Sequence, residues 1–71
     1  MKKKQQIVNG KAITSMRIAK DLTLIELAEK AGVAKSYMYY IECGKKTPSI
    51  TVAVKIAQAL GCTVDDLLRA G

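Results

Sequence analysis

The sequence predicts an all-α protein made of one small domain with five short helices. Its 71 residues include a single proline, and alanine, lysine, isoleucine and leucine are the commonest residue types, a mixture that favours helices. Hydrophobic residues make up 49% of the chain, which is too many for a disordered polymer. Because the three tyrosines are the only aromatic residues, we expect an aliphatic core. Residues that start and stop helices divide the chain into five segments.

The first helix is expected from about Gly10 to near Asp21. Ile13, Met16 and Leu22 are spaced to lie on one face of it. An aspartate is a weaker helix stop than a glycine, because the left-handed backbone conformation is less favourable for a residue with a side chain. The sequence therefore defines the end of this helix less sharply than the ends that follow.

The second helix has a clear start and a clear end. Thr23 can cap its first turn, and Glu26, three residues later, completes a capping box. Gly32 supplies the left-handed residue with which helices commonly end. The inner face of this helix is expected to consist of Leu27, Ala28 and Ala31. A short link, residues 32–34, leads to the next helix, which is the outline of a helix-turn-helix unit.

The segment 35–43 carries all three tyrosines, and its phase indicates a third helix. At about 100° per residue, Met38 and Ile41 fall on one side of this helix and form a sensible inner face. The outer side then consists of Lys35, Ser36, Tyr39, Tyr40 and Cys43. A strand would leave no polar face, so the helix is preferred despite the β-propensity of tyrosine and isoleucine. Such an outer face either contacts a partner molecule or consists of ordinary amphipathic surface residues.

A fourth helix is expected after Pro48, with Ser49 as its cap and Gly61 as its stop. Its buried face is predicted to contain Ile50, Ala53, Val54, Ala57 and Leu60. A fifth, short helix is expected to begin at Thr63, with Asp66 as the capping partner three residues later. The predicted architecture is therefore five helices in one domain.

The formal net charge is +6, and the positive charge is concentrated near the N-terminus. Residues 1–20 contain six basic residues and no acidic residue, and residues 1–9 are expected to form a flexible basic arm. Residues 35–47 carry a further positive excess, whereas the charges of residues 48–71 balance. This asymmetry suits a polyanionic partner, most simply a nucleic acid, and the alternative is a basic surface kept for solubility.

The composition argues against several other classes of protein. There is no histidine, no nucleophile with an adjacent base and no glycine-rich phosphate loop, so an enzyme is not expected. Cys43 and Cys62 lack the spacing and partner ligands of a zinc site, and both are expected to be free thiols. No apolar run could span a bilayer and the basic start lacks an apolar signal sequence, so we expect a cytoplasmic protein. No cofactor, metal or small-molecule ligand is expected.

A resemblance to the phage repressor/Cro-type (XRE-like) helix-turn-helix family is carried by residues 22–68, LTLIELAEKAGVAKSYMYYIECGKKTPSITVAVKIAQALGCTVDDLL. Within that family, bacterial sporulation and biofilm repressors are particularly similar to the piece AEKAGVAKSY. The resemblance implies a compact five-helix, lambda-repressor-like DNA-binding domain over residues 10–69. Its helix-turn-helix would occupy about residues 23–43, and residues 70–71 would form a tail.

The resemblance also implies roles for individual side chains. By position in the family motif, the third helix would read bases with Lys35, Ser36 and Tyr40, with Tyr39 close enough to assist. Further side chains, on the helices and in the loop after the third helix, match or adjoin positions that contact phosphate. These are Arg17, Thr23, Tyr37, Cys43, Lys45, Lys46 and Thr47. Backbone N–H groups at the starts of the second and third helices would add donors to phosphates.

Arg17 and Glu42 match a pair that forms a partly buried salt bridge between the first and third helices in some family members. Glu42 lies on the inward side of the third helix by phase, so the same bridge is predicted here. The chain departs from the family pattern where Leu24 replaces a common glutamine that reaches DNA and Ala34 replaces the usual serine cap. Tyrosines also stand at reading positions that commonly hold small or glutamine-like residues. The operator sequence therefore cannot be taken from a relative.

These features predict a sequence-specific regulator of transcription, a repressor, that binds double-stranded DNA with its third helix in the major groove. Because one helix reads few base pairs, we expect a symmetric homodimer on a palindromic operator with half-sites about 34 Å apart. Val64, Leu67 and Leu68 are candidates for the dimer contact, although Leu67 is expected in the core. The alternative is a protein-interaction module, such as an antitoxin or a regulator that binds a protein partner through the tyrosine face.

Overall fold

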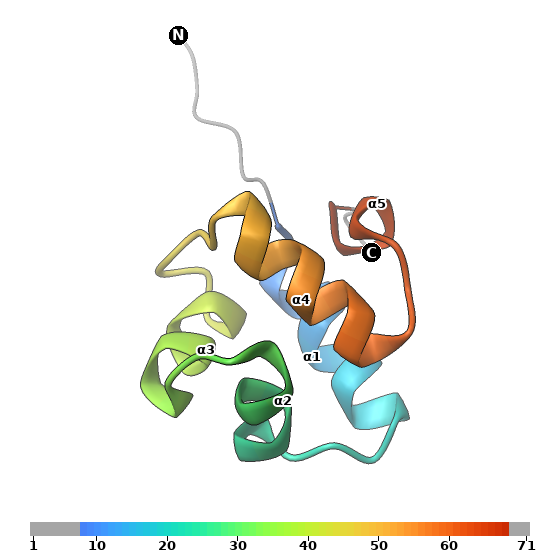
Figure 1. Cartoon of the computed structure of the whole chain (residues 1–71), viewed down its shortest axis with the longest axis horizontal. Helices are drawn as coiled ribbons and strands as arrows, with labels where there is room; N and C mark the ends of the chain where they lie inside the picture. Colours follow the sequence, from blue (N-terminus) through green and yellow to red (C-terminus); the bar gives the residue numbers. More distant parts are fainter. Residues whose placement is uncertain (1–7, 69–71) are drawn as a thin grey trace, which may run out of the picture.

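The computed structural model describes residues 8–68 of the chain, and α-helices are the only regular secondary structure in this part of the protein, as predicted. The helices are α1 (Gly10–Ala19), α2 (Leu24–Ala31), α3 (Lys35–Glu42), α4 (Ile50–Leu60) and α5 (Val64–Leu68). Figure 1 shows α2 and α3 on one side of α4 and α5 on the other, while α1 passes behind α4. Most of the predicted arm and all of the predicted tail lie outside the described residues.

Side-chain caps set the starts of α2, α4 and α5 where the sequence predicts them. The Glu26 amide donates to Thr23 Oγ1 at 3.0 Å, and the Thr23 amide donates to Glu26 Oε1 at 2.8 Å, which completes the capping box. Ser49 Oγ accepts from the Val52 amide at 3.2 Å. Thr63 and Asp66 form a second reciprocal pair, with distances of 3.1 and 3.2 Å. These caps satisfy N–H groups that the first helical turn leaves unpaired.

The start of α1 involves two residues that the sequence analysis assigns to the basic arm. Val8 is buried against the core. The Asn9 side chain caps α1 by accepting from the amides of Lys11 and Ala12, at 3.0 and 3.3 Å. The Asn9 amide also donates to the carbonyl of Leu67 at 2.7 Å. Val8 and Asn9 are therefore part of the folded domain.

The end of α1 lies earlier than Asp21. The helix ends at Ala19, and Asp21 adopts φ 61°, the only positive φ of a residue other than glycine within residues 8–68. The Leu22 amide then donates to the Arg17 carbonyl at 3.0 Å, and the Asp21 amide donates to the Ile18 carbonyl at 2.9 Å. These two bonds form a Schellman-type helix end, which glycine usually provides. Asp21 thus adopts the left-handed conformation that ends α1, as Gly32 and Gly61 do at the ends of α2 and α4.

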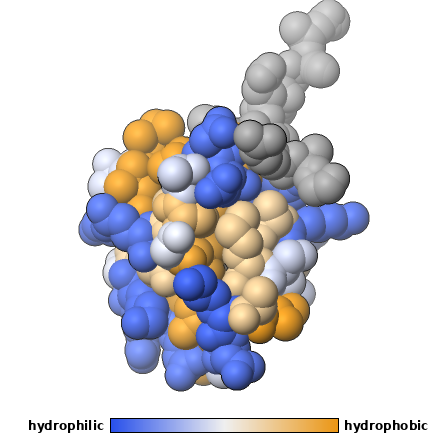
Figure 2. All heavy atoms as spheres, turned by 90° about the vertical axis from the view of Figure 1, so that its right-hand side faces the viewer, coloured by the Kyte–Doolittle hydropathy of each residue, from blue (hydrophilic) through white to orange (hydrophobic). Residues whose placement is uncertain are grey.

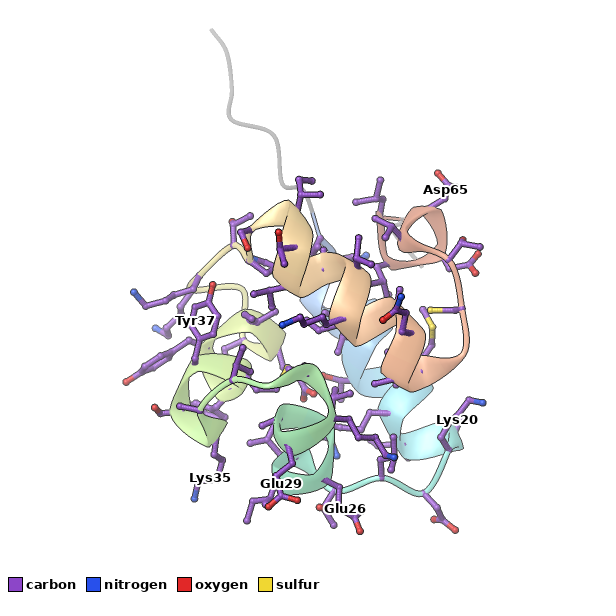
Figure 3. All side chains as sticks on the ribbon, viewed as in Figure 1. Lys20, Glu26, Glu29, Lys35, Tyr37 and Asp65 are labelled. Atoms are coloured by element: carbon purple, nitrogen blue, oxygen red, sulfur yellow. The ribbon has the colours of Figure 1, made fainter. Side chains whose placement is uncertain are left out.

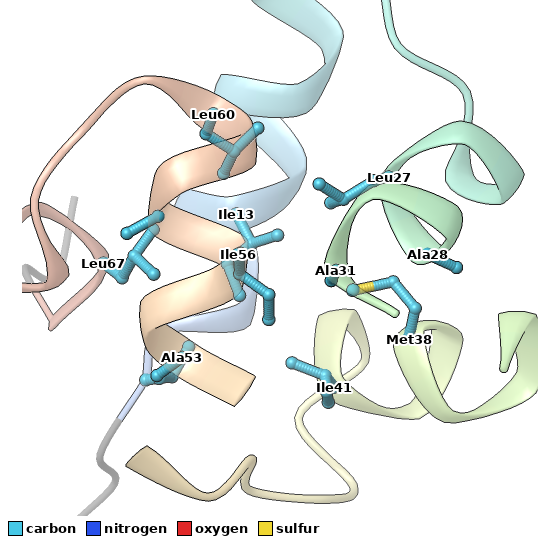
Figure 4. Close-up of a cluster of buried hydrophobic side chains, with 12 residues drawn as sticks. Ile13, Leu27, Ala28, Ala31, Met38, Ile41, Ala53, Ile56, Leu60 and Leu67 are labelled. Carbon is cyan, nitrogen blue, oxygen red and sulfur yellow. The ribbon is translucent and has the colours of Figure 1, made fainter. Parts of the chain in front are cut away.

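All five helices contribute to one aliphatic core, shown in Figure 4. The predicted inner faces of α2 and α3 are confirmed, because Leu27, Ala31, Met38 and Ile41 are at most 1% exposed. Leu67 from α5 is also fully buried. A small domain buries a limited fraction of its surface, so each of these side chains matters for stability.

The predicted buried face of α4 is partly wrong. Ile50 and Val54 are 61% and 37% exposed, whereas Ile56, which the prediction omits, is fully buried. The observed face is centred on Ala53 and Ile56, together with Ala57 and Leu60. Val54 lies one residue, about 100°, away from Ala53, and Ile50 lies at the exposed end of the helix. An apolar side chain therefore does not mark the core side of this helix at every position.

Candidate nucleic-acid interface

The turn between α2 and α3 fixes how α3 lies against the domain. Gly32 adopts a left-handed conformation with φ 73°, and the Val33 amide donates to the Ala28 carbonyl at 3.0 Å. Ala34 makes no side-chain cap to α3, as the sequence predicts. The first N–H groups of α3 are therefore not paired with a capping side chain. They belong to the end of the helix where anions bind favourably.

The outer face of α3 carries the side chains that the helical phase places there. Lys35, Ser36 and Cys43 are exposed, and Tyr39 and Tyr40 are 53% and 40% exposed. Figure 3 shows Lys35 pointing away from the body of the domain. The α3 helix is thus anchored by its inner side chains and presents a contiguous outer face of mixed polar and aromatic character.

Tyr39 and Tyr40 lie next to each other on this face. Their ring centroids are 5.8 Å apart, and the ring planes are inclined by 55°. The Cys43 side chain raises the pKa of Tyr39 above its ordinary value. The larger cause is hydrogen bonding with Cys43, and the next is the charge of Cys43 when it is ionised. Tyr39 is therefore a neutral phenol at physiological pH, and its hydroxyl group can both donate and accept.

The linker between α3 and α4 places positive charge beside this face. Gly44 adopts φ 81°, and the Lys45 and Lys46 amides both donate to the Tyr40 carbonyl, at 2.8 and 3.2 Å. Pro48 is buried, so the linker is held at both ends. The side chains of Lys45, Lys46 and Thr47 are all exposed. The structure therefore brings the two lysines to the C-terminal end of α3.

Arg17 and Glu42 form the predicted salt bridge between α1 and α3. Arg17 Nε lies 2.8 Å from Glu42 Oε2, and Arg17 Nη2 lies 3.1 Å from Glu42 Oε1. The side chains are 16% and 8% exposed. Arg17 Nη1 also donates to the Leu22 carbonyl at 2.9 Å, and Thr14 Oγ1 donates to Glu42 Oε1 at 2.9 Å. This network joins α1, the segment that leads into α2, and the end of α3.

The other predicted phosphate contacts differ in their surroundings. Thr23 is exposed at the start of α2, where its hydroxyl oxygen already accepts the capping hydrogen bond. Tyr37 is half-buried and packs against the core. Arg17 uses all three of its nitrogens within the domain, which leaves two of its N–H bonds for another partner. Leu24, which replaces the glutamine of the family pattern, is half-buried against the core.

Three residues around α1 belong to this architecture but were missed in the sequence analysis. They are Asn9, Gly10 and Thr14. Gly10 and Thr14 lie on the same helical face as Arg17, at a spacing of four and then three residues. This spacing was readable from the sequence, and the predicted Arg17–Glu42 bridge placed α3 on that side of α1, but no pattern in the sequence indicates how closely the two helices approach at Gly10.

No group of three or more acidic, histidine or cysteine side chains that could hold a metal ion occurs within residues 8–68. No helix in this part of the chain is long and apolar enough to cross a membrane.

The fold and this surface define a class of protein, the helix-turn-helix domains of transcriptional regulators. The chain belongs to that family, because the sequence model of the family described as "Helix-turn-helix" matches residues 13–67. The transcriptional regulator SinR of Bacillus subtilis is 47% identical over 60 residues, which cover 83% of this chain and 54% of that protein. The immunity repressor protein of Bacillus phage phi105 is 36% identical over 59 residues, 83% of this chain and 41% of the repressor.

A solved structure of SinR, the master regulator for biofilm formation, in complex with DNA has the same fold. It superimposes with a TM-score of 0.79 at 46% identity and covers 84% of this chain and 97% of that one. The chain spans about half the length of the curated relatives that it matches. The similarity to them therefore concerns the helix-turn-helix part of those proteins.

Proposed function

We propose that this chain is a sequence-specific repressor that binds double-stranded DNA with α3 in the major groove. The observation that carries the proposal is the outer face of α3, where exposed Lys35, Ser36, Tyr39 and Tyr40 lie beside the linker lysines. An α-helix fits the major groove, and hydroxyl and ammonium groups can bond base edges there. The similarity to a phage immunity repressor and to SinR, which was solved with DNA, supports repression and DNA as the partner.

In this proposal the side chains divide into two groups. Lys35, Ser36, Tyr39 and Tyr40 read bases. The phosphate-contacting side chains are Arg17, Thr23, Tyr37, Cys43, Lys45, Lys46 and Thr47. Phosphate contacts fix the position of the domain on the duplex, and base contacts supply the sequence preference. The uncapped N-terminus of α3 adds backbone N–H donors near the backbone of the DNA.

A symmetric dimer completes the proposal. Paired recognition helices about 34 Å apart read two half-sites on one side of the duplex. Among the dimer candidates, Leu67 is fully buried and Leu68 is 45% exposed. Ile50 and Val54 on α4 are also exposed, and α4 packs against α5. We propose that Ile50, Val54 and Leu68 form the contact with the second copy.

The charges near this contact fit self-association better than DNA binding. Asp65 and Asp66 lie on α5, where they would repel phosphate, and Lys55 on α4 can attract acidic groups of a second copy. Figure 2 shows the face that carries α5, on which apolar and polar side chains are mixed.

Three side chains cover only part of the roughly 800 Å² per partner of a standard interface. The dimer is therefore expected to be weak in free solution and to assemble on DNA.

Selection of bound sites from random duplex DNA tests the proposal. The expected result is an enriched palindrome with half-site centres about 10 bp apart. Enrichment of a single half-site would contradict the dimer, but it would still support base reading by α3. No enrichment over random duplex at moderate salt would contradict sequence-specific binding.

The alternative, a protein-interaction module, is favoured by the exposed tyrosine pair alone. Salt dependence separates the two functions. DNA binding weakens steeply as salt rises, in proportion to the number of phosphates neutralised, whereas a tyrosine-mediated protein interface weakens little.

A further inference from the structure

Gly10, the first residue of α1, lies in direct contact with the backbone of the last turn of α3. A Cβ atom at this position would lie 2.5 Å from the Glu42 carbonyl oxygen and 2.6 Å from the Ile41 carbonyl oxygen. Real Cβ atoms essentially never approach other atoms this closely, and backbone atoms cannot rotate away as a flexible side chain can. Only glycine therefore fits here without a shift of one of the two helices.

The need for glycine arises from packing and not from backbone conformation. The described glycines with positive φ are Gly32, Gly44 and Gly61, and Gly10 is not among them. Gly10 is also buried, so its missing side chain makes room for α3 and not for solvent. The close approach is a property of the joint between α1 and α3.

The same joint is held by polar contacts on either side of Gly10. Thr14 Oγ1, one turn later, lies 3.2 Å from the Gly10 carbonyl oxygen and 2.9 Å from Glu42 Oε1, so its single proton is shared between these two acceptors. Arg17, a further turn along, binds Glu42 through its guanidinium group. On the other side, the Asn9 amide donates to the Leu67 carbonyl of α5. The start of α1 is thus fixed between α5 and the end of α3.

We propose that Gly10 is a positioning residue for the recognition helix. It lets α1 lie directly on the last turn of α3, and this contact sets where Tyr40 and the linker lysines stand relative to the rest of the domain. The inference rests on the proposed function, in which α3 reads bases. Gly10 is buried and contacts no DNA in this proposal, but it affects how well the protein discriminates between DNA sequences.

The expected displacement is large enough to matter for recognition. To reach an ordinary contact distance of 3.4 Å or more, a Cβ atom at position 10 requires the helices to separate by about 1 Å. Functional groups must be held within about 0.5 Å of their productive geometry. The hydrogen bonds to bases should therefore weaken. Phosphate contacts depend on charge and tolerate small shifts, so they should persist.

The test compares Gly10→Ala with Gln58→Gly and with the unchanged protein. Gln58 is exposed on α4, and its replacement lowers stability through the poor helix propensity of glycine, which makes it a control for stability loss alone. Affinity is measured for a selected duplex and for random duplex, at a temperature where each variant is folded by circular dichroism. Backbone amide chemical shifts of residues 35–47 are recorded in parallel.

We expect Gly10→Ala to lower the ratio of selected-duplex to random-duplex affinity about tenfold, with random-duplex affinity changed less than about twofold. Its amide shifts should change along α3 and the linker. Gln58→Gly should leave the ratio and those shifts unchanged. A folded Gly10→Ala protein that keeps the ratio would overturn the inference.

A second variant decides the matter if Gly10→Ala does not fold. Thr14→Val removes the hydroxyl group that bridges Gly10 and Glu42, and it adds no clash at position 10. It is expected to lower the same ratio about threefold, and an unchanged ratio would overturn the inference. An unchanged protein that does not discriminate the two duplexes contradicts the proposed function instead. The amide shifts then still report whether Gly10 positions α3.

Discussion

The Arg17–Glu42 pair shows how single residues hold α3 in place. Glu42 is only 8% exposed, and it accepts hydrogen bonds from both Arg17 and Thr14. A buried charge is tolerated when it is paired and hydrogen-bonded, and it becomes costly when one partner is removed. The attraction between the two side chains therefore contributes little to the stability of the domain, whereas removal of one partner lowers the stability strongly.

Replacement of Arg17 by alanine is expected to destabilise the domain by about 2–3 kcal/mol, because Glu42 would retain only Thr14 as a side-chain partner. Lys20→Ala is the matched control, since Lys20 is an exposed cation just beyond the same helix and should cost less than about 0.5 kcal/mol. Urea unfolding followed by circular dichroism measures both. Equal losses for the two variants would show that the bridge contributes only as surface charge.

The sequence predicted this pair but not its surroundings. Helical phase and the family motif together placed Arg17 opposite Glu42. The bonds from Arg17 to the Leu22 carbonyl and from Thr14 to Glu42 depend on the path of the chain after α1. Such contacts come from tertiary packing, and local patterns carry no direct information on them.

At the scale of helices, the ends of the elements follow local chemistry. The Thr23–Glu26 box, the Ser49 cap and the Gly32 and Gly61 stops all appear where the sequence predicts them. Each of these depends on side chains within a few residues of the helix end. The end of α1 also lies near Asp21, as the sequence predicts, although an aspartate and not a glycine occupies the left-handed position there.

Asp21→Gly is expected to stabilise the domain by about 0.5–1 kcal/mol. Glycine adopts positive φ without steric cost, and the change removes a negative charge from the C-terminal end of α1, where the helix dipole disfavours it. Thermal unfolding measures the gain. Asp21→Ala separates the two causes, because it removes the charge but keeps a Cβ atom. It should destabilise, and a stabilising Asp21→Ala would show that charge, and not backbone strain, dominates.

The packing face of a helix was harder to predict than its ends. The faces of α2 and α3 were predicted correctly because their apolar and polar residues separate clearly. In α4 almost every residue is apolar, so the pattern fits several phases, and Ile50 and Val54 were assigned to the core although they are exposed. The neighbouring helices decide which of these phases is buried. Gly10 belongs to the same category, because only the approach of α3 explains it.

At the scale of the whole molecule, the charges divide the domain into two regions. Residues 35–47 carry positive charge around the outer face of α3, and α5 carries Asp65 and Asp66. The first region suits phosphates, and in the proposed dimer the second lies at the contact between the two copies. The sequence was sufficient for the fold, the helix-turn-helix and the exposed side chains of α3. For the joint between α1 and α3 it was sufficient for the salt bridge but not for the close backbone contact at Gly10.

The most direct test of the central claim, that α3 reads bases, is the binding of Tyr40→Ala and Lys46→Ala to the selected operator and to random duplex over a range of salt concentrations. Lys46→Ala is expected to weaken both complexes alike and to reduce the salt slope by about one. Tyr40→Ala should lose about 1–3 kcal/mol of binding free energy on the operator, leave random-duplex binding and the salt slope nearly unchanged, and relax the preference at one position of each half-site. Equal, sequence-independent losses from both variants would contradict base reading by Tyr40.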